Sequence, residues 1–204
     1  MNTDPPSGGS SDVTLKIDPT SIGRLNILFG GLGPGNDPGP WWKASAWMSA
    51  ANVSFLVGDP MQDYEIELTA DVEGQIDGPS AGGITTAAIL AALRGDSVRS
   101  DVAMTGTINP DGSIGPVGGI EAKLEGAKEA NKSIVLIPYE QKNQDISNQS
   151  RRLGLDLKEV ADIYEAYEAL TGQSLPKLPP ADGRIQLSEA LLSSQWILYN
   201  GGTF

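Results

Sequence analysis

One short segment of the chain holds a serine in a setting that suits nucleophilic catalysis. The run Asp77-Gly78-Pro79-Ser80-Ala81-Gly82 contains Gly-x-Ser-x-Gly, the nucleophile-elbow pattern of the α/β-hydrolases. Small neighbours allow a sharp turn, and the helix that follows would direct its N–H groups toward charge developing near Ser80. Hydrolases of that fold remove the serine proton with histidine, and the sequence contains no histidine. The α/β-hydrolase interpretation therefore fails, and a helix N-cap is the ordinary alternative for Ser80.

A second segment, about 40 residues further on, supplies a base of another kind. In Gly118-Gly119-Ile120-Glu121-Ala122-Lys123, the lysine comes one turn into a helix that we predict from Gly119 to about Asn131. Most helical lysines are solvated, but an ammonium held among apolar side chains loses its proton more easily. Because the chain has neither histidine nor cysteine, acid–base chemistry near neutral pH must use carboxylates, lysine, tyrosine, hydroxyls or a terminal amine.

Taken together, the two segments resemble the proteolytic domain of Lon proteases, which work by a Ser–Lys dyad. The similarity runs through Asp77–Pro138, continues more loosely through Glu159–Gly172 and extends on the N-terminal side to about Ser21. It is closest to archaeal-type or stand-alone Lon-like proteins, because TGTINPDGSIGPVGG occurs here without an ATPase part. The resemblance implies that Ser80 is the nucleophile and Lys123 the general base.

The resemblance also implies roles for residues around this pair. Thr105 would help to hold the lysine amine, and Asp77 would position the loop that carries Ser80. The other supporting residues are the immediate neighbours of the serine, Gly78, Pro79 and Ala81. A carboxylate beside Lys123 would raise its pKa, so we expect neither Asp77 nor Glu121 to pair with the amine.

Strand and helix patterns along the chain indicate an α+β or α/β domain, and the resemblance implies the α+β class with mixed small sheets packed with helices. We predict strands at Val13–Ile17, Arg24–Phe29, Tyr64–Thr69, Val102–Ile108, Ile134–Ile137 and Leu157–Val160. We predict helices at Trp41–Leu56, Ser80–Leu93, Gly119–Asn131 and Asp162–Leu170. The expected organisation is a flexible tail at 1–12, the Lon-like domain at 13–175, and an extension at 176–204. That extension, with grouped apolar residues at Leu187–Leu198, is expected to pack on the body or on a neighbouring subunit.

Composition excludes several classes of function. The chain has 14 Lys+Arg against 26 Asp+Glu, a net charge of −12, which argues against binding duplex nucleic acid. We expect no metal and no cofactor, since Asp71, Glu73 and Asp77 form a small acidic cluster better explained as a solvated loop. No stretch approaches the roughly 20 apolar residues of a membrane span, and the N-terminus lacks a signal peptide pattern. The expected location is cytoplasmic.

These observations lead to one preferred function and one rival. The glycine-rich loop after Phe29 lacks G-x-G-x-x-G, and no G-x-x-x-x-G-K-[ST] occurs, so no nucleotide site is encoded. We expect an ATP-independent serine endopeptidase that cleaves unfolded proteins or peptides, with an unfoldase, if any, supplied as a separate partner. The resemblance implies a homo-oligomer, with a hexameric ring favoured; the rival is a non-catalytic ring-forming module that binds partners.

Trp41, Trp42 and Trp47 are expected to pack in the core or at a subunit contact, with a place in the substrate groove as the alternative.

Overall fold

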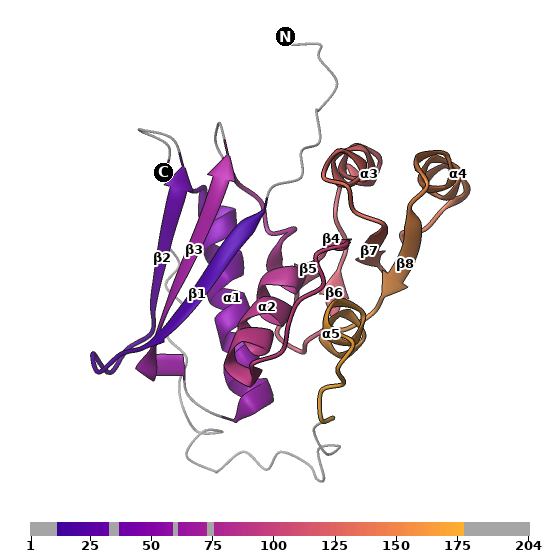
Figure 1. Cartoon of the computed structure of the whole chain (residues 1–204). Helices are drawn as coiled ribbons and strands as arrows, with labels where there is room; N and C mark the ends of the chain where they lie inside the picture. The colour runs from indigo at the N-terminus through magenta and orange to yellow at the C-terminus, as the bar shows by residue number, and fades with distance from the viewer. Residues whose placement is uncertain (1–11, 33–36, 59–60, 73–75, 178–204) are drawn as a thin grey trace, which may run out of the picture.

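The N-terminal half of the chain builds one three-stranded sheet and two helices that cover it. The structure, a computed structural model, describes residues 12–32, 37–58, 61–72 and 76–177. Strand β3 (Tyr64–Val72) lies in the centre of the sheet, antiparallel to β1 (Val13–Pro19) and parallel to β2 (Asn26–Leu32). Both helices, α1 (Pro40–Val57) and α2 (Gly82–Arg94), lie on the same side of this sheet (Figure 1).

The two helices pack closely because small residues dominate the faces that they share. The buried positions of α2 are mostly Gly, Ala, Thr, Ile and Leu, as expected for a helix enclosed on nearly all sides. Helix α1 turns Trp42 inward, where its ring lies 5.1 Å from that of Phe29. The main core lies between the sheet, these two helices and the last helix, α5 (Ile163–Thr171).

The C-terminal half builds a second sheet of three parallel strands. Its order is β4 (Val102–Met104), β7 (Ile134–Pro138) and β8 (Asp156–Val160). Helices α3 (Ile120–Glu129) and α4 (Gln144–Leu153) pack on it around a smaller core of Leu124, Val135 and their neighbours. The remaining elements are a two-stranded hairpin and a single 3₁₀ turn, namely β5 (Thr107–Ile108), β6 (Ile114–Gly115) and η1 (Met61–Asp63).

The strand predicted at Val102–Ile108 is wrong as a single element. It is divided into β4 and β5 at Thr105 and Gly106. The Thr105 N–H still donates to the Leu136 carbonyl of β7 at 3.0 Å. The Gly106 N–H donates to the Ser80 carbonyl at 2.8 Å, and the Gly83 N–H donates to the Gly106 carbonyl at 3.0 Å. The strand is broken at Gly106, because the backbone N–H and carbonyl of this glycine are bonded to Ser80 and Gly83 and not to a neighbouring strand.

Other predictions from sequence stand as follows. The α+β class with small mixed sheets is confirmed. Helix α2 begins at Gly82, two residues after the predicted start, and helix α4 was not predicted. The predicted apolar segment Leu187–Leu198 and the acidic residue Glu73 lie outside the described residues. Within the described part of the chain, no helix is long and apolar enough to cross a membrane.

Candidate active site

Ser80 lies in a tight turn immediately before α2. The Gly82 N–H donates to the Pro79 carbonyl at 3.0 Å, which closes the turn around the serine. The Ser80 carbonyl accepts from the Gly106 N–H, so the turn is also fixed to the break between β4 and β5. Ser80 itself is only partly buried, which leaves its hydroxyl accessible at the start of a helix. The positive end of the α2 dipole therefore lies beside the serine.

Asp77 connects the segment before Ser80 to the beginning of α1. Its Oδ1 accepts from the backbone N–H groups of Trp41 at 2.9 Å, Trp42 at 3.1 Å and Gly78 at 2.8 Å. Helix α1 has Gly39 at its N-cap position and no capping side chain of its own. A Cβ at Gly39 would collide with the Asp77 carboxyl group, so glycine is required there for the aspartate to approach. Asp77 thus caps a helix from which it is 35 residues distant in sequence.

Lys123 reaches the same region from the first turn of α3. Its Nζ donates a hydrogen bond of 3.0 Å to Thr105 Oγ1, and this hydroxyl donates a longer bond of 3.4 Å to the Ser80 carbonyl. The lysine amine and the serine backbone therefore share one threonine as a partner. No direct hydrogen bond joins the side chains of Ser80 and Lys123 in the described residues; catalytic hydrogen bonds are often long before substrate binds.

The surroundings of Lys123 favour its neutral form. Burial lowers the pKa of this lysine from the ordinary value of 10.5, because desolvation penalises the ammonium. The buried side chains of Ile120 and Leu124 belong to the same turns of α3. Across the described residues Lys123 forms no ion pair, and neither Asp77 nor Glu121 contacts its amine. An uncharged amine beside a serine can accept the proton of the hydroxyl.

Two buried serines of α1 support the Ser80 turn, and our sequence reasoning missed them. Ser45 Oγ donates to the Pro79 carbonyl at 3.2 Å, and Ser49 Oγ donates to the Gly82 carbonyl at 3.0 Å. They lie at i and i+4 on the face of the helix that also buries Trp42 and Val53. The sequence contained one signal for this role: hydroxyl side chains lie on a helix face that was predicted to be apolar. Such hydroxyls, once buried, require hydrogen-bond partners.

Gln141 is a second residue that the sequence did not reveal. Its side-chain amide accepts from the Val117 N–H and donates to the Val117 carbonyl, both at 2.8 Å. These two bonds fix the glycine-rich segment before α3, whose N-cap residue Gly119 has a φ of 66° and provides no side-chain cap. Gln141 thereby holds the chain three residues before α3, the helix that carries Lys123. No local pattern marks it, since it follows β7 and lies 24 residues from its partner.

The remaining candidates divide into buried and exposed residues. Trp42 is buried, with 2% of its surface exposed, so it packs in the core as predicted. Trp41 and Trp47 are exposed, and for these two residues the subunit contact stays a prediction. Among the described residues no group of carboxylates could hold a metal ion. Asp77 Oδ1 is engaged with backbone N–H groups, which is a capping role.

Comparison with known proteins identifies the family of the chain. Residues 48–171 match the family described as the Lon protease (S16) C-terminal proteolytic domain. The chain is 39% identical to a Lon protease of Buchnera aphidicola subsp. Acyrthosiphon pisum over 104 residues, which are 50% of this chain and 13% of the relative. It is 41% identical to the Lon protease of Escherichia coli K12 over 86 residues, 42% of this chain and 9% of the relative. It is 34% identical to a Lon protease of Geobacter metallireducens over 139 residues, 65% of this chain and 16% of the relative.

The pairwise matches thus cover only a small part of each relative's length. The family match covers more than half of this chain. The matched range contains Ser80, Thr105 and Lys123 together. The kinship inferred from two short motifs is confirmed, and the chain belongs to the family of Lon protease C-terminal proteolytic domains.

Proposed function

We propose that this chain is an ATP-independent serine peptidase in which Ser80 is the nucleophile and Lys123 the general base. Ser80 Oγ attacks the carbonyl carbon of a peptide bond while Lys123 Nζ takes the hydroxyl proton. The same proton then passes to the leaving amine, and water hydrolyses the acyl-enzyme by the reverse sequence. In this proposal, backbone N–H groups near Ser80 and the residues before it stabilise the tetrahedral oxyanion.

One observation carries the proposal: the partly buried Lys123 amine is bonded to the Thr105 hydroxyl, which in turn bonds the Ser80 carbonyl, and within the described part of the chain it pairs with no carboxylate. An exposed lysine has roughly one neutral amine in 10³ at pH 7, which is too few for an efficient base. Burial increases this fraction, and Thr105 orients the amine without adding charge.

Unfolded polypeptides are the substrates that this site suits best. Several copies of the chain would assemble around the substrate, and a hexamer is the favoured assembly. An extended chain exposes its peptide bonds to a serine in a surface turn, whereas a folded protein does not. Incubation with casein, with and without ATP, tests the proposal. Equal cleavage under both conditions, lost in Ser80→Ala, is the expected result. No cleavage under either condition would favour a non-catalytic binding module.

Activity should depend on pH in the direction set by Lys123. Because burial lowers the pKa of this amine from 10.5, kcat/KM should rise with pH and level off before pH 10.5. The profile on a short fluorogenic peptide gives the apparent pKa directly. A profile that does not vary between neutral and alkaline pH would contradict the role of the amine.

Gln141 provides a test of how the lysine is positioned. Gln141→Met removes both hydrogen bonds to Val117, and we expect kcat to fall about 10-fold, which is about 1.4 kcal/mol in the activation barrier, while KM changes little. Gln144→Met is the matched control, since the Gln144 amide contacts only Asn148 on the surface of α4. Equal kinetics for the two variants would show that the contact to Val117 does not affect catalysis.

A further inference from the structure

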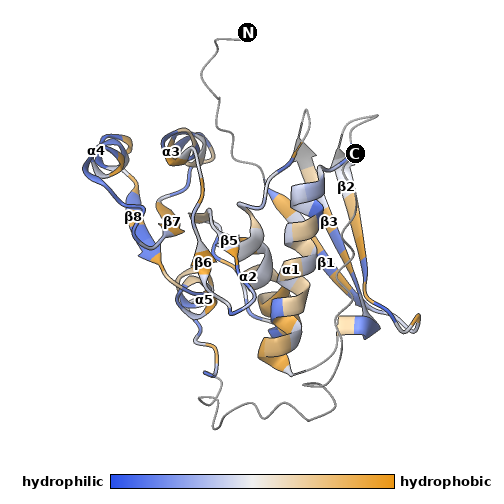
Figure 2. Ribbon diagram, turned by 180° about the vertical axis from the view of Figure 1, so that it is seen from behind, coloured by the Kyte–Doolittle hydropathy of each residue, from blue (hydrophilic) through white to orange (hydrophobic). Residues whose placement is uncertain are grey.

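The hydroxyl groups of Ser45 and Ser49 join helix α1 to the backbone on both sides of Ser80. Ser45 is 7% exposed and Ser49 is fully buried. Ser45 donates to the carbonyl before Ser80, that of Pro79, and Ser49 donates to the carbonyl of Gly82 at the start of α2. Helices α1 and α2 pack against each other along the chain segment that these bonds connect (Figure 2). The position of α1 therefore determines the position of the backbone at Ser80.

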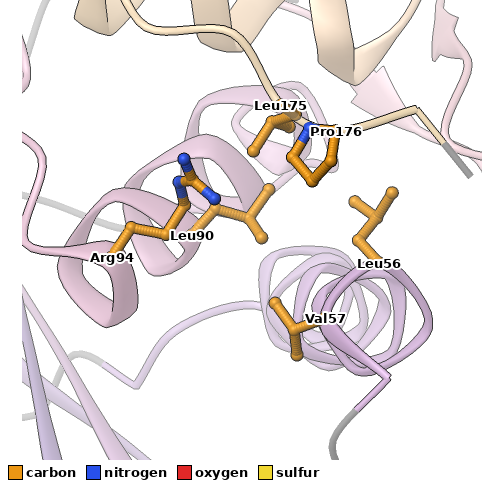
Figure 3. A pocket seen from close by; sticks show the side chains of 6 residues that line it. All are labelled: Leu56, Val57, Leu90, Arg94, Leu175 and Pro176. Carbon is orange, nitrogen blue, oxygen red and sulfur yellow. The ribbon is translucent and has the colours of Figure 1, made fainter.

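Gly82 allows Ser45 to come this close. A Cβ at Gly82 would lie 2.8 Å from Ser45 Oγ and 2.8 Å from Ile108 Cγ2, which is shorter than real contacts of a Cβ atom. The last glycine of the Gly-x-Ser-x-Gly pattern is thus required for packing against α1. At the C-terminal ends of the same helices there is instead a cavity of about 240 Å³, lined by Leu56, Val57, Leu90, Arg94, Leu175 and Pro176 (Figure 3). The tight contact between the two helices is therefore made next to Ser80.

The bond from Ser45 sets the direction of the peptide group between Pro79 and Ser80. The Pro79 carbonyl accepts from Ser45 Oγ at 3.2 Å and from the Gly82 N–H at 3.0 Å. In a planar trans peptide the N–H points away from the carbonyl oxygen, so fixing the Pro79 carbonyl also fixes the Ser80 N–H. Within the described residues this N–H has no hydrogen-bond partner, and Ser80 is only partly buried. The N–H is therefore available to an atom of a bound substrate.

We propose that Ser45 is a positioning residue, which acts through the Pro79 carbonyl to hold the Ser80 N–H in the direction that bonds the oxyanion of the tetrahedral intermediate. Ser49 supports Ser45, because its hydroxyl is shared between the Gly82 carbonyl at 3.0 Å and the Ser45 carbonyl at 2.9 Å. A donor that is aligned in advance stabilises the transition state more than the bound substrate. The inference rests on the proposed function, since the oxyanion forms only if Ser80 attacks a carbonyl carbon.

A peptide boronate tests this role, because its tetrahedral adduct with a serine resembles the intermediate. The same peptide ending in a carboxamide resembles the bound substrate instead. In Ser45→Ala we expect boronate affinity and kcat to fall by a similar factor of about 10, less than for a donor that is removed outright, while carboxamide affinity changes little. The pH at which kcat/KM levels off should not change, because Ser45 bonds Pro79 and Lys123 bonds Thr105.

Ser150→Ala is the matched control. Ser150 is a buried serine of α4, and its hydroxyl donates to the Ser147 carbonyl of the same helix at 3.3 Å. Its removal deletes a buried hydroxyl of the same kind in the smaller core. Boronate affinity and kcat should therefore stay near those of the unsubstituted protein.

Two results would overturn the inference and leave the proposed function intact. Equal boronate affinity and kcat in Ser45→Ala and Ser150→Ala would show that the Ser45 hydroxyl does not orient the Ser80 N–H. Equal losses of affinity for boronate and carboxamide would show that Ser45 only maintains the shape of the substrate site. Failure of the proposed function has a different signature: the unsubstituted protein would bind the boronate no more tightly than the carboxamide, and the inference would fall with it.

Discussion

Replacing Lys123 by methionine should reduce kcat/KM on casein or a flexible peptide by at least about 10³-fold, the scale of a lost general base. Methionine keeps most of the apolar stem of the side chain but cannot accept the Ser80 proton. Ser80→Ala should have an effect of the same order, and the double variant should be no worse than either single one, because the two residues act as a unit. Steady-state kinetics on one substrate at several pH values measures all three.

Lys128→Met serves as the control, because Lys128 is an exposed lysine on the same helix. Its activity should match that of the unsubstituted protein. If Lys123→Met retained the original turnover, another base would have to serve Ser80.

Measuring the stability of Lys123→Met distinguishes a loss of activity from a loss of folding. The pKa of Lys123 is lower in the folded chain than the 10.5 of an exposed lysine, so the unfolded chain binds this proton more tightly. Lys123 therefore lowers the free energy of unfolding at neutral pH, and this penalty disappears as pH rises to about 10.5. Lys123→Met should be at least as stable as the original chain at pH 7, and thermal unfolding across pH measures the difference.

The second large effect is expected at Asp77. Asp77→Ala removes the acceptor for three backbone N–H groups, two of them at the beginning of α1. We expect a loss of about 1–2 kcal/mol in the free energy of unfolding, typical of a lost helix cap. We also expect kcat/KM to fall about 10²-fold, because a displacement of the Ser80 turn by even 1 Å misplaces the nucleophile. Denaturant unfolding and peptide kinetics measure the two effects separately.

Asp162→Ala distinguishes positioning from general destabilisation. Asp162 caps α5 by accepting from the Glu165 N–H at 2.9 Å, so its loss should cost similar stability. Activity at a temperature where both variants are folded should remain near normal in Asp162→Ala alone. Asp77→Asn should recover part of the activity, since its amide oxygen still accepts from the α1 backbone. Equal losses of activity in Asp77→Ala and Asp162→Ala would show that Asp77 has only a structural role.

Local patterns predicted most of the elements that surround the site. The small-residue run after Ser80, the alternation in Tyr64–Thr69 and the apolar run at Ile134–Ile137 each match an observed helix or strand. These segments are predictable because burial on one or all sides dictates their composition. Helix α4 was missed because few of its residues are apolar, although Asn143 caps it with a bond to the Ile146 N–H.

Contacts between distant segments could not be predicted in the same way. The division of Val102–Ile108 results from hydrogen bonds between Gly106 and the turn at Ser80, and nothing within the strand indicates it. Gln141 and the serines of α1 act on backbone groups 24 to 34 residues away. Composition and periodicity describe a segment and its own burial, whereas these bonds depend on how the two sheets are placed.

Covalent labelling tests the pairing of serine and lysine most directly. A fluorophosphonate reacts with a serine hydroxyl only when a base activates it, and mass spectrometry then identifies the modified residue. The account predicts one adduct, on Ser80, at a rate that rises with pH below 10.5 and falls sharply in Lys123→Met but not in Lys128→Met. An adduct on another residue, or labelling of Ser80 at an unchanged rate in Lys123→Met, would contradict it.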